Sequence, residues 1–188
     1  MNQDKVIRIF EEKGALLKGH FQLSSGFHSS AYLQCALVLQ YPEYAEKLCS
    51  QLAECFKDDK PTCVVAPALG GVIVSYEVAR ALGARAIFTE RKDGKMLLRR
   101  GFEIKKSDRV VVVEDVITTG LSTKEVIETV MSTGASIIGV GSIINRSGKK
   151  IDFGVKSNSL IKLDLPVFPP EQCPLCKKGV KITKPGSR

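Results

Sequence analysis

The chain has 188 residues, of which 44% are hydrophobic and 26% charged, and its formal net charge is +8. This length suits one domain and this composition supports a hydrophobic core, which excludes a disordered chain and a small disulfide-stapled protein. The excess positive charge falls mainly in residues 91–100 and 171–188, each with five basic residues and one acidic residue. Two local patches suit a phosphate-rich small molecule as well as they suit DNA, and we expect no nucleic-acid partner.

The sequence predicts a cytoplasmic protein without a membrane partner. No window approaches the roughly 18 consecutive apolar residues of a membrane span, and residues 1–14 form an amphipathic helical pattern with acidic residues rather than a signal peptide. Four of the six cysteines stand singly in apolar or helical surroundings. We expect them to be reduced and packed as small hydrophobic side chains: Cys35, Cys49, Cys55 and Cys63.

In chain order, apolar residues at helical spacing first predict helices at 4–13 and 42–56. Pro42 suits the first turn of the second helix. Between the two helices, residues 20–34 mix apolar residues with a Ser/Gly cluster, which predicts two short strands around a polar turn.

From residue 62 the pattern becomes that of a parallel sheet. Short, continuously apolar strands are predicted at 62–66, 86–89, 110–113 and 137–144, with helices at 72–82 and 122–133 and a weaker strand at 160–163. Continuous apolar strands indicate burial on both faces, and their alternation with helices indicates right-handed crossovers. We therefore predict an α/β fold with an open, mostly parallel sheet flanked by helices, whose ligands lie at the carboxyl ends of the strands.

The segment 110–122 carries the clearest chemistry. A buried strand ends in Glu114 and Asp115, and Thr118–Gly120 then lead to Ser122, which we expect to be the N-cap of a helix. Backbone N–H groups, hydroxyls and a helix N-terminus at one point suit a phosphate monoester. The adjacent carboxylates would repel a second phosphate but accept hydrogen bonds from a diol, so the predicted ligand is a ribose 5-phosphate.

Other nucleotide-binding motifs do not fit the sequence. The P-loop pattern G-x-x-x-x-G-K-[ST] is absent, and Gly139-x-Gly141 lies inside an apolar strand without the third glycine of a Rossmann motif. The alternative for 110–122 is an ordinary strand, loop and helix with incidental acids.

The segment Val110–Ser122 resembles the phosphoribosyl-diphosphate signature of type I phosphoribosyltransferases, with Glu114–Asp115 as the paired acids and Thr118–Ser122 as the 5-phosphate loop. Within that superfamily, the chain resembles the orotate phosphoribosyltransferases over roughly residues 3–165. The element F-x-L-x-S-G-x-x-S matches residues 21–29, and Asn145–Arg146 stand where the family's orotate-contacting arginine follows a core strand. Arg91–Lys92 open a segment similar to the family's mobile catalytic loop.

The resemblance implies one phosphoribosyltransferase domain over 1–188, with a small N-terminal hood at about 1–40 and a Cys-containing basic tail at about 166–188. It implies Mg²⁺-dependent transfer of the 5-phosphoribosyl group from 5-phosphoribosyl 1-diphosphate to orotate, giving orotidine 5′-monophosphate and pyrophosphate in pyrimidine (UMP) synthesis. Mg²⁺ would be bound mainly through the substrate diphosphate, and the protein would be a homodimer. The alternatives are a purine-base phosphoribosyltransferase and a non-enzymatic regulator that binds the sugar diphosphate.

The expected catalytic residues are Lys92 and Lys95, which would stabilise the leaving pyrophosphate, and Asp115. A solvated basic hairpin is the alternative for 91–100, and a surface ion pair is the alternative for Arg146. The two glycines of the turn 67–71 would let amide groups approach the pyrophosphate. The expected substrate-binding residues are Ser25, Gly26, Tyr32, Leu69, Gly70, Gly71, Arg91, Glu114, Asp115, Val116, Ile117, Thr118, Thr119, Gly120, Leu121, Ser122 and Arg146.

The sequence departs from the family pattern at three places. Ser24 stands where the family commonly has a lysine, Gly70 stands where its pyrophosphate loop has one, and residues 91–101 lack the histidine found in many relatives. These departures suggest a divergent branch similar to forms from some thermophilic bacteria and archaea.

Cys173-Pro-Leu-Cys176 has the form of half a zinc ribbon. One C-x-x-C supplies two of the four ligands of a structural zinc site, and the sequence shows no second pair nearby. Zinc at Cys173 and Cys176 could therefore be shared across a subunit interface, or the two thiols could form a reduced or bridged pair. His20 and His28 are weak signals: we interpret His28 as structural or solvent-facing, with ligand contact as the alternative.

Overall fold

The computed structural model describes residues 1–23, 26–148 and 150–184. Its helices are α1 (Gln3–Glu12), α2 (Ala36–Leu39), α3 (Pro42–Ala53), α4 (Gly71–Leu82), α5 (Leu121–Met131) and α6 (Pro174–Lys177), with 3₁₀ turns at Lys57–Asp59 and Pro170–Gln172. Its strands are β1 (Leu16–Gln22), β2 (His28–Leu33), β3 (Cys63–Pro67), β4 (Arg85–Lys92), β5 (Lys95–Leu98), β6 (Arg109–Ile117), β7 (Ser136–Asn145), β8 (Ser157–Lys162) and β9 (Val167–Phe168).

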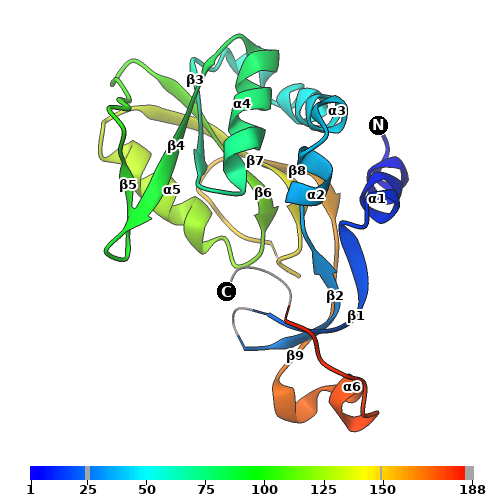
Figure 1. The fold of residues 1–188 in the computed structure, drawn as a ribbon. Coiled ribbons are helices and arrows are strands. Elements are labelled where there is room, and N and C mark those ends of the chain that lie inside the picture. The colour runs from blue at the N-terminus through cyan, green and yellow to red at the C-terminus, as the bar shows by residue number, and fades with distance from the viewer. Residues whose placement is uncertain (24–25, 149, 185–188) are drawn as a thin grey trace.

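Six strands form the central sheet in the order β5-β4-β3-β6-β7-β8 (Figure 1). All neighbouring pairs are parallel except β4 and β5, which form an antiparallel hairpin. The predicted open, mostly parallel α/β sheet is therefore confirmed. Because β3, β6 and β7 run in the same direction, the segments that follow them meet at one edge of the sheet.

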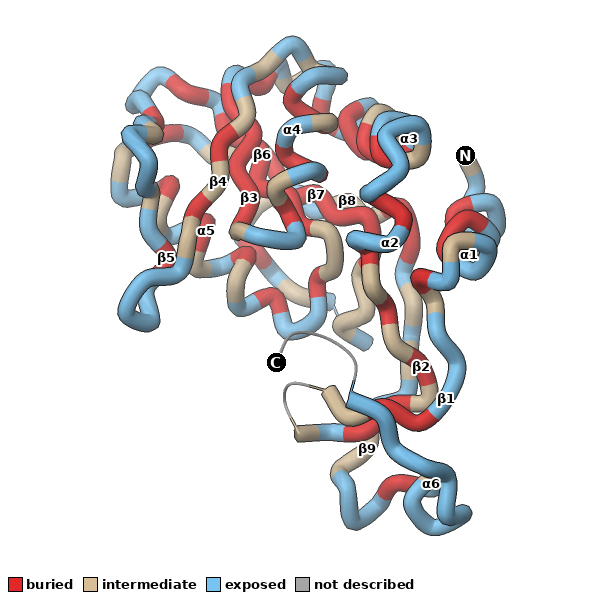
Figure 2. Tube along the Cα trace, viewed as in Figure 1, coloured by how far each residue is buried: buried red, intermediate tan, exposed pale blue. Residues whose placement is uncertain are grey.

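Alternate residues of the central strand β6 face two separate cores. Val111 and Val113 pack in a cluster that includes residues of α3 and α4, whereas Val110 and Val112 pack in a second cluster with residues of α5. All four valines are fully buried, and the buried strands appear as an inner layer in Figure 2. Burial on both faces explains why β6 is a continuous run of valines rather than an alternation of apolar and polar residues.

The glycines of β7 make room for an aromatic side chain. A Cβ atom at Gly139 would lie 2.6 Å from Cε1 of Phe56, and one at Gly141 would lie 3.0 Å from Cε2 of the same ring. Phe56 is completely buried between α3 and the sheet. The Gly139-x-Gly141 pair thus has a packing role, in agreement with its exclusion as a dinucleotide motif.

A smaller sheet in the order β1-β2-β9 extends from one side of the central sheet (Figure 1). Strands β1 and β2 form the predicted hairpin, and β9, from the C-terminal part of the chain, pairs with β2. The tail then reaches the other edge of the hairpin, where the N–H of Gln22 donates to Thr183 and the N–H of Thr183 donates to His20. The two ends of the sequence therefore build one structural unit.

Two local predictions were wrong. Ser122 is not the N-cap of α5: Gly120 holds that position with φ of 78°, and Ser122 lies in the first turn. Cys55 is exposed, whereas Cys35, Cys49 and Cys63 are free thiols buried as expected.

Among the described residues, no helix is long and apolar enough to cross a membrane.

The close contact at Gly139 gives a stability prediction. Gly139→Ala should lower the free energy of unfolding by about 1–3 kcal/mol, because the added methyl group overlaps the Phe56 ring. Chemical denaturation measures this change, with Ser136→Ala at the exposed start of the same strand as control. Phe56→Leu should partly relieve the clash, so the double variant should lose less stability than the sum of the single changes. Unchanged stability of Gly139→Ala would contradict this packing.

Candidate active site

Three parallel strands deliver the predicted site residues to one edge of the sheet. The turn after β3 contains Leu69 to Gly71, β6 ends in the acidic pair, and Arg146 directly follows β7. The N–H of Arg146 donates to the carbonyl of Ile117 at 2.9 Å, which joins the ends of β6 and β7. The site is thus a consequence of the strand order β3-β6-β7.

A cavity of about 110 Å³ lies between the end of β6 and the first turn of α5. Its size and its lining of backbone amides and hydroxyls suit a single phosphate group. At its rim, Oγ1 of Thr119 accepts a hydrogen bond from the N–H of Leu121 at 3.3 Å. The lining residues are Glu114, Val116, Ile117, Thr118, Thr119, Gly120, Leu121, Ser122 and Thr123, of which Thr123 was not predicted.

The two acids differ in their surroundings. Glu114 is buried, and burial together with the negative charge of neighbouring Asp115 raises the pKa of Glu114 well above its usual range. Asp115 is half-buried, and its Oδ1 accepts the N–H of Val116 at 2.9 Å. Asp115 is thus the acid that is held in place while still open to a ligand.

Asp115 also packs directly against the turn after β3. A Cβ atom at Gly70 would lie 2.7 Å from both carboxylate oxygens of Asp115. A larger residue at position 70 would require the Asp115 carboxylate to turn away from this turn. The peptide bond between Ala68 and Leu69 is cis, and Leu69 is 88% exposed at the tip of this turn.

The basic segment 91–100 forms the β4–β5 hairpin rather than an irregular loop. Arg91 forms an ion pair with Glu125 of α5 and also donates to the carbonyl of Gly94. Arg99 and Arg100 both form ion pairs with Glu90 of β4, which ties the end of the segment to this strand.

The two lysines of this hairpin lie nearest its turn. Lys92 and Lys95 are exposed and face each other across the two strands. Within the described part of the chain, neither lysine has an acidic partner within 4.0 Å. They are therefore the cations of this hairpin that can reach an anionic ligand without first breaking an ion pair.

Arg146 is half-buried directly after β7. Burial lowers the pKa of the Arg146 guanidinium, and Tyr32 acts in the opposite direction. The Tyr32 hydroxyl donates to Oε1 of Gln34 at 3.1 Å. Gly26 lies in the turn between β1 and β2 with φ of 83°, while Ser25 lies outside the described residues.

Cys35 is a neighbour of the site that the sequence did not reveal. Its thiol lies 3.9 Å from the carbonyl oxygen of Asp115. Burial, followed by the charges of Asp115 and Glu114, raises the pKa of Cys35 well above its usual range, so this thiol stays protonated. The contact joins residues 80 positions apart, which no local pattern could indicate.

A larger cavity of about 450 Å³ lies beside β8, and its lining includes Asn145 and Ser147, the two neighbours of Arg146. It is open to solvent and contains none of the predicted site residues. Its lining is Asn145, Ser147, Gly148, Lys150, Ile151, Ser157, Ser159, Lys162, Leu163 and Asp164. We assign the chemistry to the smaller cavity because the convergent donors and acids lie there.

Comparison with known proteins identifies the family to which the chain belongs. Residues 38–169 match the family described as phosphoribosyl transferase domain. The fold and the site thus define a phosphoribosyltransferase of type I. The chain is 56% identical to an orotate phosphoribosyltransferase of Caldanaerobacter subterraneus subsp. tengcongensis over 188 residues, covering 100% of this chain and 99% of the relative. It is 57% identical to that of Thermotoga maritima over 180 residues, covering 96% of each chain. The chain belongs to the orotate phosphoribosyltransferase family.

Solved structures share the same fold. The crystal structure of orotate phosphoribosyltransferase from Aeropyrum pernix superposes with a TM-score of 0.71 at 25% identity, covering 84% of this chain and 93% of that one. An adenine phosphoribosyltransferase from Rhodothermus marinus gives a TM-score of 0.65 at 21% identity, covering 84% and 99%. The fold is therefore common to enzymes named for different bases.

The buried acid at position 114 gives a pH-dependent prediction. The pKa of Glu114 is higher in the folded protein than in the unfolded chain, where it is about 4.3. The free energy of unfolding therefore falls as the pH rises above about 4.3, and this loss is absent at lower pH. Glu114→Gln, which resembles the protonated acid, should therefore raise the free energy of unfolding at pH 7 and leave it nearly unchanged near pH 4. Urea denaturation across this range measures the effect, with exposed Glu128→Gln on α5 as control. A loss of stability at pH 7 would show that ionised Glu114 supports the fold.

Proposed function

We propose that the protein transfers the 5-phosphoribosyl group from 5-phosphoribosyl 1-diphosphate to N1 of orotate, giving orotidine 5′-monophosphate and pyrophosphate. The observation that carries the proposal is the small amide-lined cavity directly beyond the Glu114–Asp115 pair on the central strand. A phosphate and an adjacent diol fit these two features together. The orotate specificity follows from the family to which the chain belongs.

The chain's residues act mainly by positioning. The 5-phosphate would accept hydrogen bonds from the amides and hydroxyls of 118–122 at the start of α5. Asp115 would accept hydrogen bonds from the ribose hydroxyls and, being negatively charged, would stabilise positive charge that develops on the sugar as the bond to pyrophosphate breaks. Holding sugar and base in line supplies a further part of the rate.

The pyrophosphate would lie between the turn 67–71 and the basic hairpin. Amide groups at Gly70 and Gly71 can approach it closely because neither glycine carries a side chain of its own. Lys92 and Lys95 would neutralise its growing charge. Oxygen ligands suit Mg²⁺, which usually binds through substrate phosphates and a few carboxylates; the acidic pair and a diphosphate together fit that ion. When bound, Mg²⁺ would offset charge on the leaving group.

Orotate differs from uracil and the purines by its carboxylate. Arg146 is the half-buried cation at this edge of the sheet, and its planar guanidinium can bind a carboxylate through two hydrogen bonds. Tyr32 and Gly26 of the β1–β2 hairpin would form the wall over the base. This side of the site is the one that should select orotate.

The choice of base is tested by measuring pyrophosphate release with a panel of free bases. An unpaired buried donor costs roughly 1–3 kcal/mol, so orotate should exceed uracil, hypoxanthine, guanine and adenine in kcat/KM by at least about tenfold. Arg146→Gln should reduce this preference, whereas Arg109→Gln at the opposite end of β6 should not. Equal or better turnover of a purine would overturn the assignment.

We also propose that the protein works in the cytoplasm as a homodimer. Burial raises the pKa of Cys49 to about 12 and that of Cys63 to about 11, as expected for inert, reduced thiols. Ile73 and Tyr76 are exposed and lie three residues apart on one face of helix α4, and exposed Leu69 lies in the turn just before this helix. Such an apolar face beside the pyrophosphate turn suits contact with a second copy.

The dimer would let the basic hairpin of one subunit serve the site of its partner. Lys92→Ala and Asp115→Asn proteins, each expected to be inactive, should then regain activity when mixed. Each mixed dimer would contain one site with both elements intact, so activity of up to about half that of the wild type is expected from two-fold symmetry. No recovery after verified subunit exchange would show that the hairpin serves its own site.

A further inference from the structure

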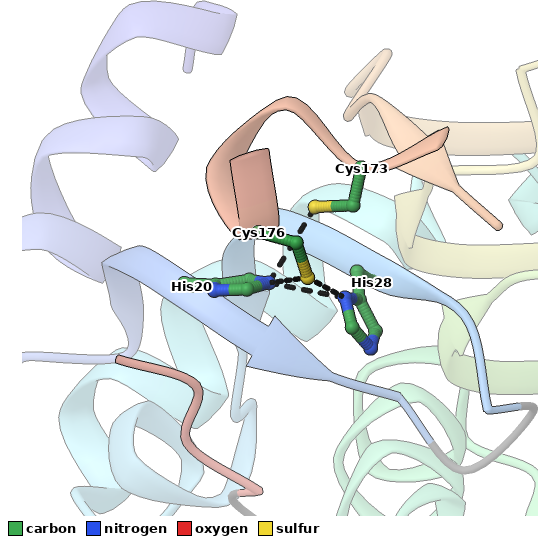
Figure 3. Close-up of side chains that lie close together, drawn as sticks. All are labelled: His20, His28, Cys173 and Cys176. Atoms are coloured by element: carbon green, nitrogen blue, oxygen red, sulfur yellow. Dashed lines mark hydrogen bonds between the residues drawn. The ribbon is translucent and has the colours of Figure 1, made fainter. Parts of the chain in front are cut away.

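Four side chains that play no part in the proposed reaction converge beneath the β1–β2 hairpin (Figure 3). His20 comes from β1, His28 begins β2, Cys173 follows the second 3₁₀ turn and Cys176 lies in α6. Nε2 of His20, Nδ1 of His28 and the two sulfur atoms all lie within 4.8 Å of one another. We refer to these four residues as the His2Cys2 cluster.

Four distances within this cluster lie close to the edges of a tetrahedron around zinc, two within the expected range and two slightly shorter. Zn–N bonds of about 2.05 Å and Zn–S bonds of about 2.3 Å place the ligand atoms of a regular tetrahedron about 3.3–3.8 Å apart. The two nitrogens are 3.1 Å apart, and Cys176 Sγ lies 3.2 Å from His28 Nδ1. Nε2 of His20 lies 3.5 Å from Cys173 Sγ and 3.7 Å from Cys176 Sγ.

The surroundings of His20 prepare it to bind a metal. Its Nδ1 lies 2.7 Å from the carbonyl oxygen of Val180, an atom that can only accept a hydrogen bond. Nδ1 must therefore carry the proton, which leaves a lone pair on Nε2 directed at the other three ligands. A carbonyl that fixes the tautomer of a ligating histidine is the usual outer contact of a metal site.

Burial and charge also favour a metal here. His20, His28 and Cys173 are exposed by only 3%, 6% and 0%. Two thiolates and two neutral imidazoles balance the charge of a divalent cation, so the complex would leave no net charge inside the protein. A closed tetrahedral set of two nitrogens and two sulfurs selects zinc rather than Mg²⁺ or Ca²⁺.

The C-terminal segment has little else to hold it in place. Of the described residues after Ile161, Cys173 is the one that is buried, and α6 buries no apolar side chain. The segment nevertheless crosses the whole hairpin, from β9 on one side to Thr183 on the other. A metal ion bound by its two cysteines and by the hairpin histidines would hold the segment against the hairpin, as structural metals do in other small units without a large hydrophobic core.

We propose that each chain binds one structural zinc ion through His20, His28, Cys173 and Cys176, which fastens the C-terminal segment to the β1–β2 hairpin. The four ligands come from a single chain, so the site needs no partner subunit. It stands apart from the proposed catalytic residues and requires no turnover. Through β2, the zinc would hold the hairpin whose turn contains Gly26.

Metal analysis of the purified full-length protein tests the proposal. Inductively coupled plasma mass spectrometry should find about one zinc per chain in the wild type and in Cys55→Ser, which removes an exposed cysteine outside the cluster. Cys176→Ser should lose most of the zinc. Cobalt in place of zinc should give the intense visible bands of a tetrahedral site and thiolate-to-cobalt charge transfer in the wild type but not in Cys176→Ser.

A second measurement uses only the wild type, in case the variant does not fold. A thiol reagent should label Cys55 readily and Cys176 slowly, and a strong chelator should remove zinc, expose Cys176 to labelling and lower the melting temperature. Absence of stoichiometric zinc, a Cys173–Cys176 disulfide found by mass spectrometry, or unchanged zinc in folded Cys176→Ser would each overturn the proposal. None of these results depends on the base that the enzyme uses.

Discussion

The contact between Gly70 and the carboxylate of Asp115 is the constraint on which the active site depends. It places the turn after β3 against the end of β6, with no space for a side chain between them. The acid and the amides of the turn thereby form one surface, on which a sugar diphosphate could contact both. A side chain at position 70 would displace the Asp115 carboxylate from the position that it holds in this structure.

Strand β6 also contains a residue that lowers the stability of the folded protein. Val110–Val113 of β6 are fully buried on both faces of the sheet, and this burial extends to Glu114, whose charge is disfavoured there. A protein selected for stability alone would replace such an acid with a neutral residue. Its presence at the end of a strand buried on both faces is the kind of local conflict that marks a functional position.

Regular elements and the acidic pair could be predicted from the sequence because each depends on residues close together in the chain. The run of valines in β6 indicates a strand buried on both faces, and the acids with the Thr-Thr-Gly turn directly follow it. Contacts between distant segments could not be predicted. His20 and Cys173 are 153 positions apart, and they meet because the tail pairs with the hairpin at β9 and again at Thr183.

Some local details could not be predicted from the sequence either. Ser122 has the composition of an N-cap, but the left-handed conformation of Gly120 starts α5 two residues earlier. The partner of Arg91 depends on how α5 packs beside the β4–β5 hairpin, so Glu125 carried no signal of its own.

The central claim is that the acid at the end of β6 acts on the sugar and is not a structural residue. Steady-state kinetics of Asp115→Asn, together with its thermal unfolding, tests this claim most directly, with exposed Asp58→Asn as control. Asparagine keeps the shape beside Gly70 but removes the charge. We predict a fall in kcat/KM of about 10²-fold or more with a melting temperature close to that of the wild type. Near-native kinetics in the folded variant would contradict the account.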